Sequence, residues 1–222
     1  MDKKKYVIIV AGGKGLRMGG EVPKQFQCLG DLPVLMHTIN RFYHTISSLT
    51  ILLVLPSEQH LYWDTLCKEY SFQVPVTLVA GGETRFHSVQ NGVSCITDIE
   101  ALVAVHDGVR PFVSSAVIEH CFEMANAKRA VVPVVDLVDS IRERIGSGSK
   151  TVNRNQYKLV QTPQVFQADL LIKAYQQSYN DSFTDDASVV EAMGEEIYLV
   201  QGNRENIKLT TPFDWVVAKA MV

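Results

Sequence analysis

Short apolar runs alternate with amphipathic stretches along most of the chain. Five runs rich in β-branched residues predict buried strands at 6–10, 50–55, 76–79, 101–105 and 130–135. Between them, the spacing of apolar residues predicts helices at about 34–45, 58–70, 85–96 and 115–127. Continuously apolar strands separated by helices indicate a parallel sheet covered on both faces, so the sequence predicts an α/β fold.

The pattern changes over residues 136–160. A Gly-Ser-Gly-Ser sequence separates two polar stretches, which predicts a hairpin arm that projects from the sheet at about 137–157. Beyond it we expect a helix near 167–180, a helix start within the TDDAS segment at 184–188, a short strand at 197–200 and a closing helix from about 212. Without a repeat or a low-complexity linker, residues 1–222 are predicted to form a single domain.

Composition and charge narrow the possible partners. The 222 residues are 46% hydrophobic and 20% charged, with a formal net charge of −3, which argues against a generally basic nucleic-acid binder. Four scattered cysteines without a CxxC pair are typical of free thiols in a reducing cytosol, so we expect a cytoplasmic protein. No apolar run approaches the ~18 residues that a membrane span needs, and the basic start is not a signal peptide.

The first apolar run leads directly into a glycine-rich loop, AGGKG at 11–15. Its small side chains let backbone N–H groups approach an anion, and Lys14, Arg17 and Lys24 add positive charge. The loop is neither a Walker A motif nor a dinucleotide fingerprint. A plain strand-to-helix turn would explain the glycines but not three neighbouring cations, so we expect a nucleotide-phosphate site.

Polar residues also follow the fourth predicted strand. Asp107, at the end of that strand, can hold a divalent metal while Arg110 meets a phosphate, although the pair can equally cap the next turn. The position beside the glycine-rich loop favours the metal. We interpret His106 as a packed or hydrogen-bonded residue, because no other His or Cys has ligand spacing. The loop after the third strand, at 80–88, can read a base edge or simply cap a helix.

The remaining chemistry is mostly cationic. Hydroxyl groups and cations that could bind an anionic substrate occur at 151–154, 161–164, 184–186 and 206–210, and motifs of the GxSxG, CxxC and HExxH type are absent from the sequence. Cations at loops with one aspartate suit a reaction in which one phosphate attacks another. The attacking oxygen is already ionised near neutral pH, so charge neutralisation and alignment lower the barrier without a general base.

Six motifs carry a resemblance that spans almost the whole chain: AGGKGLRMG with PKQ, AGGETRFHSV, VHDGVRP, QTPQVF, TDDAS and NIKLTTPFD. In this order they resemble the 2-C-methyl-D-erythritol 4-phosphate cytidylyltransferases of the non-mevalonate isoprenoid pathway. The resemblance implies a Rossmann-like, mostly parallel sheet of the nucleotide-diphospho-sugar transferase type with a projecting β-arm. It also implies transfer of CMP from CTP to a polyol phosphate, release of pyrophosphate, dependence on Mg²⁺ or another divalent cation, and a homodimer formed through the arm.

The resemblance further implies a role for each matching residue. Catalytic cations that offset charge in the transition state would be Arg17 and Lys24, and the metal ligand would be Asp107. Positions that bind the nucleotide would be Ala11, Gly12, Gly13, Lys14, Gly82, Arg85, Ser88 and Gly108. Positions around the polyol phosphate would be Arg110, Arg154, Thr162, Thr184 and Lys208, with Arg154 serving the partner's site. Glu205 stands where an acid near the metal is often found.

Two other hypotheses stay open. Ribitol-5-phosphate and other pentitol-phosphate cytidylyltransferases share most of the six motifs, and both kinds of substrate present a phosphate on a short polyol. Two departures touch this choice: Gly108 replaces a common alanine, and Ser140 at the base of the arm replaces a threonine. A non-catalytic nucleotide-binding module is the third hypothesis, but it would not need Lys24, Asp107 and a second anion pocket together.

Overall fold

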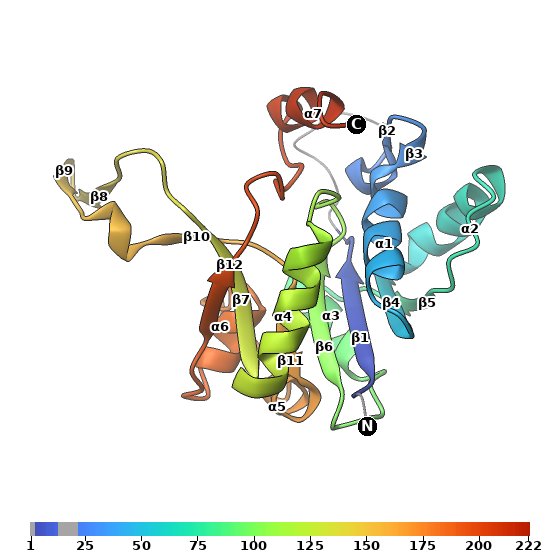
Figure 1. Ribbon diagram of the computed structural model, residues 1–222, viewed down its shortest axis with the longest axis horizontal. Coiled ribbons are helices and arrows are strands. Elements are labelled where there is room, and N and C mark those ends of the chain that lie inside the picture. Colours follow the sequence, from blue (N-terminus) through green and yellow to red (C-terminus); the bar gives the residue numbers. More distant parts are fainter. Residues whose placement is uncertain (1–2, 13–21) are drawn as a thin grey trace.

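The computed structural model describes residues 3–12 and 22–222, and within them an eight-stranded sheet forms the centre of the molecule (Figure 1). Its strands lie in the order β10-β7-β11-β6-β1-β4-β5, and β12 also pairs with β7. Their bounds are β1 Lys5–Val10, β4 Leu49–Leu55, β5 Thr77–Ala80, β6 Leu102–Asp107, β7 Ala130–Asp136, β10 Lys158–Val160, β11 Gln164–Gln167 and β12 Tyr198–Gln201. The predicted α/β class with a mostly parallel sheet is confirmed.

The sheet is not parallel throughout. Strands β5, β4, β1 and β6 run parallel, as their continuous apolar character predicts, but β11 is antiparallel to both β6 and β7, and β10 is antiparallel to β7. The sequence analysis did not predict β11. It has four residues, QVFQ, and follows a proline, so the hydrogen-bonding edges of its two long neighbours decide its structure more than its own pattern does.

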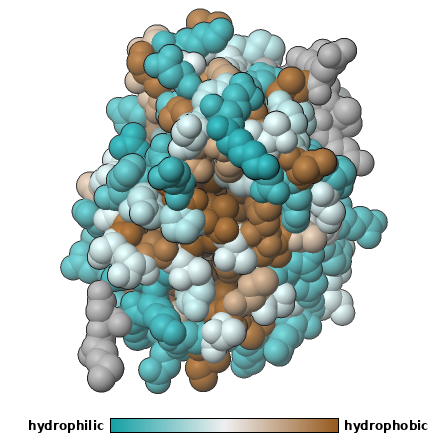
Figure 2. Space-filling model, turned by 90° about the vertical axis from the view of Figure 1, so that its right-hand side faces the viewer, coloured by the Kyte–Doolittle hydropathy of each residue, from teal (hydrophilic) through white to brown (hydrophobic). Residues whose placement is uncertain are grey.

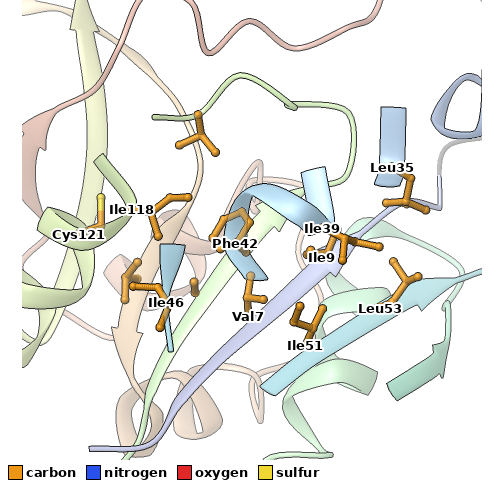
Figure 3. Close-up of a cluster of buried hydrophobic side chains, with 14 of the residues drawn as sticks. Val7, Ile9, Leu35, Ile39, Phe42, Ile46, Ile51, Leu53, Ile118 and Cys121 are labelled. Carbon is orange, nitrogen blue, oxygen red and sulfur yellow. The ribbon is translucent and has the colours of Figure 1, made fainter. Parts of the chain in front are cut away.

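Helices cover both faces of the sheet. Their bounds are α1 Val34–Thr45, α2 His60–Glu69, α3 Arg85–Val93, α4 Ser115–Lys128, α5 Ala168–Ala174, α6 Asp186–Glu191 and α7 Pro212–Lys219. Side chains of β1 alternate between the two faces: Val7 and Ile9 join the core under α1, α2 and α4 (Figure 3), whereas Tyr6 and Ile8 join the core under α3, α5 and α6. Among the described helices, none is long and apolar enough to cross a membrane.

Several predicted bounds need correction. The helix expected at 167–180 ends at Ala174, because the Gln177 side chain turns back to donate to the Ala174 carbonyl oxygen at 3.0 Å. The helix expected at 85–96 ends at Val93, and α2 is preceded by a 3₁₀ turn at Ser57–Gln59. By contrast, the helix start expected in the TDDAS segment is confirmed, since Asp185 caps α6.

The hairpin arm lies apart from the body of the molecule, at the left of Figure 1. Strands β8 Arg142–Ile145 and β9 Gly148–Thr151 pair antiparallel around Gly146, whose φ of +55° suits glycine. Every residue of both strands is exposed, including the apolar Ile145. The predicted projecting arm is therefore confirmed in position, and this chain alone does not bury it.

The opposite edge of the sheet is β5. On this side, residues 71–78 alternate between exposed and partly buried positions, and the partly buried ones pack on the core beside α2. Figure 2 shows apolar side chains in a central hollow of this face, bordered by polar ones. The carboxyl ends of β1, β5 and β6 all point to one edge of the sheet, where ligands of parallel α/β sheets collect.

Candidate active site

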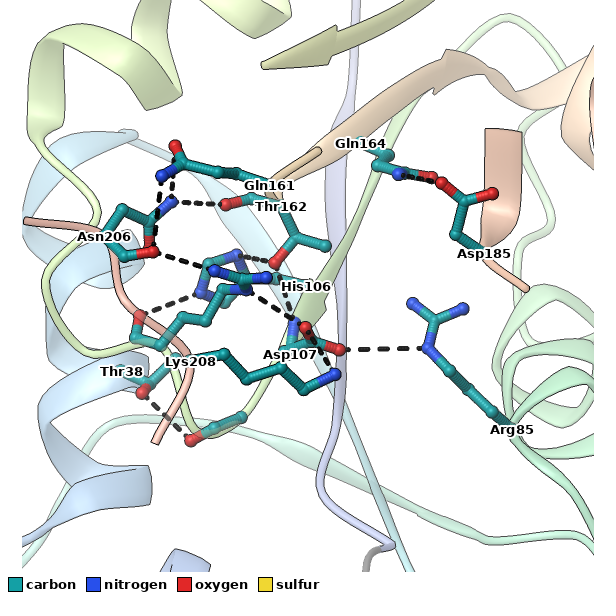
Figure 4. Close-up of polar contacts among 12 residues, drawn as sticks. Thr38, Arg85, His106, Asp107, Gln161, Thr162, Gln164, Asp185, Asn206 and Lys208 are labelled. Carbon is teal, nitrogen blue, oxygen red and sulfur yellow. Dashed lines mark hydrogen bonds and ion pairs between the residues drawn. The ribbon is translucent and has the colours of Figure 1, made fainter. Parts of the chain in front are cut away.

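Asp107 is the centre of the site at the end of β6 (Figure 4). Its Oδ2 atom lies 3.0 Å from Lys208 Nζ and 3.1 Å from Arg110 Nε, and its Oδ1 atom lies 3.8 Å from Arg85 Nε. Burial alone would raise the pKa of this carboxyl, but Lys208, Arg85 and Arg110 outweigh it and hold the pKa well below its usual range. Asp107 is therefore an anion, and three cations surround it.

Arg85 is held from the other side by Asp186. The carboxylate of Asp186 has no exposed surface and accepts from Arg85 Nη1 at 2.9 Å and Nη2 at 2.6 Å, while Tyr175 Oη donates to it at 2.6 Å. Burial would lower the pKa of Arg85, but Asp186 and then Asp107 raise it above its usual value. This bidentate pair fixes Arg85 between α6 and Asp107.

The loop between β5 and α3 is fixed by Ser88. Its hydroxyl accepts from Gly82 N–H at 3.0 Å and donates to the Thr84 carbonyl oxygen at 3.0 Å, while Thr84 caps α3. Gly82 has to be glycine here, because a Cβ would lie 2.4 Å from His87 Cβ. The glycines of this loop therefore allow a close turn that Ser88 locks in place.

Ala11, directly after β1, is fixed by Gln25, which lies in the 3₁₀ helix Lys24–Phe26 and is 1% exposed. Its side-chain amide donates to the Ala11 carbonyl oxygen and to Gln59 Oε1, both at 2.9 Å. Gly108 packs against the same residue, since a Cβ at this position would lie 2.8 Å from Ala11 Cβ. Ala11 is thus held from two sides.

A buried polar network lies behind Asp107. His106 contacts the Arg110 carbonyl oxygen at 3.1 Å and Thr162 Oγ1 at 3.0 Å, and burial lowers its pKa to about 4, so the imidazole is neutral near pH 7. The side-chain amide of Asn206 donates to the Thr162 backbone carbonyl oxygen at 2.8 Å, and the backbone carbonyl oxygen of Asn206 accepts from the Arg110 guanidinium at 2.8 Å. The segment that carries Lys208 is thereby tied to the end of β6.

Two cavities of about 300 Å³ each meet at Arg85, Asp107 and Lys208. The first is also lined by the loops after β1 and β5, including Ala11, Gly12, Lys24, Gly82 and Ser88. The second is also lined by Arg110, Thr162, Thr184 and Asp185. A ligand in one cavity can therefore approach a ligand in the other across the same three charged side chains.

Most of the predicted site residues that the structure describes line these cavities. Gly108 is instead buried beside Ala11, and Arg154 lies on the arm, where it donates to the Val138 carbonyl oxygen. Glu205 is exposed, accepts from Asn203 at 3.1 Å, and does not line either cavity. Gly13, Lys14 and Arg17 lie outside the described residues, so their predicted roles stay predictions.

Sequence reasoning missed the residues that hold the site together. Asp186, Gln25 and Asn206 are all fully or almost fully buried and bind predicted site residues. The available signal was their place in the quoted motifs: Gln25 stands in PKQ, Asp186 in TDDAS and Asn206 in NIKLTTPFD. None of the three shows its buried partner in the local pattern, and an acid in the first helical turn, such as Asp186, is already favoured by the helix dipole.

Known proteins similar to this chain identify its family. The family model of 2-C-methyl-D-erythritol 4-phosphate cytidylyltransferase matches residues 6–222. The enzymes of that name from Phocaeicola vulgatus and Porphyromonas gingivalis are 61% and 50% identical to this chain, cover 98% and 100% of it, and are each covered to 99%. The solved structure of the Francisella tularensis enzyme has a TM-score of 0.82 and 28% identity, and the match covers 99% of this chain and 100% of that one. The chain therefore belongs to the 2-C-methyl-D-erythritol 4-phosphate cytidylyltransferase family.

Proposed function

We infer that the protein transfers CMP from CTP to 2-C-methyl-D-erythritol 4-phosphate, giving 4-diphosphocytidyl-2-C-methyl-D-erythritol and pyrophosphate. Membership of the family supports this activity. The observation that carries the assignment of sites is the pair of cavities that meet at Arg85, Asp107 and Lys208. CTP takes the first cavity, beside Lys24 and the glycine loops, and the polyol phosphate takes the second, beside Arg110 and Thr184.

The transfer needs alignment and charge neutralisation. A phosphate oxygen of the polyol phosphate attacks the α-phosphorus of CTP, a new P–O bond forms, and the bond from that phosphorus to the β-phosphate bridge breaks, so pyrophosphate leaves. Three cations face Asp107 at the junction of the cavities, and Asp186 neutralises Arg85 from the other side, which leaves a local charge of +1 for the phosphates. Lys24, which lines the first cavity, adds to this field.

A divalent metal fits the donor set as a partner of the phosphates. Among the described residues there is no group of three or more His, Cys, Asp or Glu side chains that could hold a metal ion. Mg²⁺, however, is commonly bound by one or two carboxylates together with substrate phosphates. Asp107 offers an ionised carboxylate, and its Oδ1 is beyond hydrogen-bond distance from Arg85. When bound there, the metal would supply further neutralisation of phosphate charge, and pyrophosphate release should stop in excess EDTA and return with added Mg²⁺.

We also propose that the protein is a homodimer in which the arm reaches a second copy. Support comes from the arm itself: Val138 and Ile145 are 60% and 56% exposed, and Arg154 does not line the cavities of its own chain. Arg154 would then face the polyol phosphate of the partner's site. The cytoplasmic location expected from the scattered cysteines stays a prediction.

One assay tests the activity and separates the alternatives. Purified protein with CTP and Mg²⁺ should release pyrophosphate with 2-C-methyl-D-erythritol 4-phosphate, and much less with ribitol 5-phosphate. The reverse preference would identify a pentitol-phosphate enzyme, and no release with either substrate would favour a nucleotide-binding module. Lys24→Ala should lower kcat by roughly 10²–10³. Lys68→Ala, an exposed lysine on α2, is the control and should leave kcat unchanged.

A further inference from the structure

We propose that His106 is a positioning residue: as one neutral tautomer, it aligns the Thr162 hydroxyl and the turn from Asp107 to Arg110 at the wall of the second cavity. The proposal rests on the proposed function, because it assigns the polyol phosphate to that cavity. His106 itself is fully buried, packs edge-on against Phe42 at 4.7 Å between ring centroids, and lines neither cavity. Its action on the substrate must therefore pass through its neighbours.

The direction of each hydrogen bond follows from the acceptors. The carbonyl oxygen of Arg110 can only accept, so His106 Nε2 carries the proton and donates at 3.1 Å. In the neutral imidazole Nδ1 is then an acceptor, so the Thr162 hydroxyl donates to it at 3.0 Å. The backbone N–H of Asp107 in turn donates to Thr162 Oγ1 at 3.1 Å. The result is one ordered chain of hydrogen bonds from Asp107 through Thr162 and His106 to Arg110.

This series of hydrogen bonds connects three residues that line the second cavity, Asp107, Arg110 and Thr162. Asp107 and Arg110 are the two ends of one turn, whose own backbone bond runs from Arg110 N–H to the Asp107 carbonyl oxygen at 3.1 Å. Thr162 comes from the loop before β11, far away in the sequence. The imidazole therefore links the β6 turn to the β11 loop through the Thr162 hydroxyl, whereas Asn206 links the same segments through the Thr162 carbonyl oxygen and the Arg110 guanidinium.

The same series of hydrogen bonds decides whether the Thr162 hydroxyl can donate to a ligand or accept from it. Its one proton is directed to His106, and one of its lone pairs accepts from Asp107. What remains is a lone pair, which can accept from a hydroxyl of the polyol but cannot donate to a phosphate oxygen. His106 therefore favours one orientation of the second substrate, with its polyol hydroxyls toward Thr162 and its phosphate toward Arg110 and Lys208.

Two variants separate the halves of the interaction. In His106→Asn the side-chain oxygen can take the place of Nδ1 and accept from Thr162, whereas the contact to Arg110 is lost. In His106→Gln the amide nitrogen can take the place of Nε2 and donate to Arg110, whereas the acceptor for Thr162 is lost. Thr162→Val removes the hydroxyl at almost constant volume. His120→Gln is the control, because His120 on α4 is 48% exposed and lines neither cavity.

The readout is steady-state kinetics with each substrate varied, together with the melting temperature. We expect His106→Gln and Thr162→Val to lower kcat/KM for 2-C-methyl-D-erythritol 4-phosphate by roughly 10- to 100-fold, with KM for CTP within twofold of the parent protein. His106→Asn should lose less than His106→Gln. Both single variants remove the hydrogen bond between the Thr162 hydroxyl and His106 Nδ1. The double variant His106→Gln/Thr162→Val should therefore lose no more kcat/KM than the poorer of the two single variants.

Several outcomes would overturn the proposal. One is a kcat/KM for 2-C-methyl-D-erythritol 4-phosphate within twofold of the parent in both His106 variants. The others are an equal loss of kcat/KM for CTP and for the polyol phosphate, and losses of kcat/KM that add up in the double variant. If neither His106 variant folds, nitrogen NMR of the parent protein still decides, because a proton on Nδ1 instead of Nε2 of His106 would break the hydrogen-bond direction that the proposal needs. Failure of the proposed function is distinguishable, because the parent protein would then release no pyrophosphate with 2-C-methyl-D-erythritol 4-phosphate before any variant is tested.

Discussion

The end of β6 and the hairpin arm are both rich in charged residues, but the charged residues of the first bind buried partners from distant segments, whereas those of the second bind exposed partners within the hairpin. At the end of β6, Asp107 and Arg85 are bound to each other and to partners from α6, from the turn after β6 and from the loop before α7, and the polar groups behind them are buried. On the arm, Arg142 bonds Ser149 and Thr151 of its own hairpin, and both strands are exposed. One chain is therefore enough to shape the first region, whereas the second has its geometry set by little besides its own turn.

The largest expected effect lies in the buried pair of Arg85 and Asp186. Asp186→Asn removes the negative charge of this side chain and one of the two oxygens that accept from Arg85. The Arg85 guanidinium then lacks its nearest anion. Loss of one partner of a buried pair typically costs about 3–5 kcal/mol of the free energy of unfolding, which urea denaturation would measure. The control is Asp136→Asn, at the base of the arm, where the exposed pair with Lys158 should leave the urea midpoint unchanged. Equal shifts for the two variants would contradict the comparison.

The next effect should separate activity from stability at the end of β6. Lys208→Met removes one of three cations around Asp107, and Lys208 is 42% exposed. We expect kcat to fall by roughly 10²–10³, because transition-state charge loses a partner. The melting temperature should fall only slightly, because Lys208 is partly exposed and Arg110 still pairs with the Asp107 carboxylate at 3.1 Å. A kcat within a few-fold of the parent protein would remove Lys208 from the reaction, and Lys68→Met is the matched control.

For the arm, we expect the effect on the association of two chains, which depends on protein concentration. Ile145→Asp places a charge on its apolar tip, and it should weaken association of two chains by roughly 30-fold, a value typical of an interface hot spot. Light scattering after gel filtration would measure the mass, and pyrophosphate release per chain should fall on dilution more steeply than for the parent. The melting of the body should not change, because both strands of the hairpin are exposed. A parent protein that is monomeric at every concentration would contradict the dimer.

The contrast between local and distant contacts also explains what the sequence could predict. Helix α1 has the bounds that its apolar spacing indicates, and the strands beside the site, β1, β4 and β6, lie within two residues of their predicted ranges. Their signals are local periodicities. Strand β11 was not predicted, because its state depends on pairing with β6 and β7 rather than on its four residues.

The site divides in the same way. Asp107 was predicted as a metal ligand because it stands at the end of a parallel strand beside the glycine-rich loop; the structure places it beside both cavities, and its metal role stays a prediction. Its neighbours were harder to find. Arg85 and Asp186 are 101 residues apart, and a single sequence contains no sign that the two meet. The motifs contain both the residues that line the cavities and the residues that hold them, such as Asn206, but only the fold shows which partner each of them binds.

The smallest effect concerns the support behind the end of β6, where α7 packs on Val109 and Leu209. Partial burial would raise the pKa of Asp214, but the N–H groups of Thr210 and Thr211 and their hydroxyls hold it below its usual value. A carboxyl with a lowered pKa in the folded state stabilises above its unfolded value, about 3.9, and this contribution is lost as pH falls through the folded value. Asp214→Ala should therefore cost about 1 kcal/mol at pH 7, and urea denaturation should show the difference shrinking below about pH 4. Thr211→Ala removes the other half of the same capping box but only one of several groups that lower the pKa of Asp214, so its cost should depend on pH less than that of Asp214→Ala; an equal pH dependence in both variants would contradict the role of the Asp214 charge.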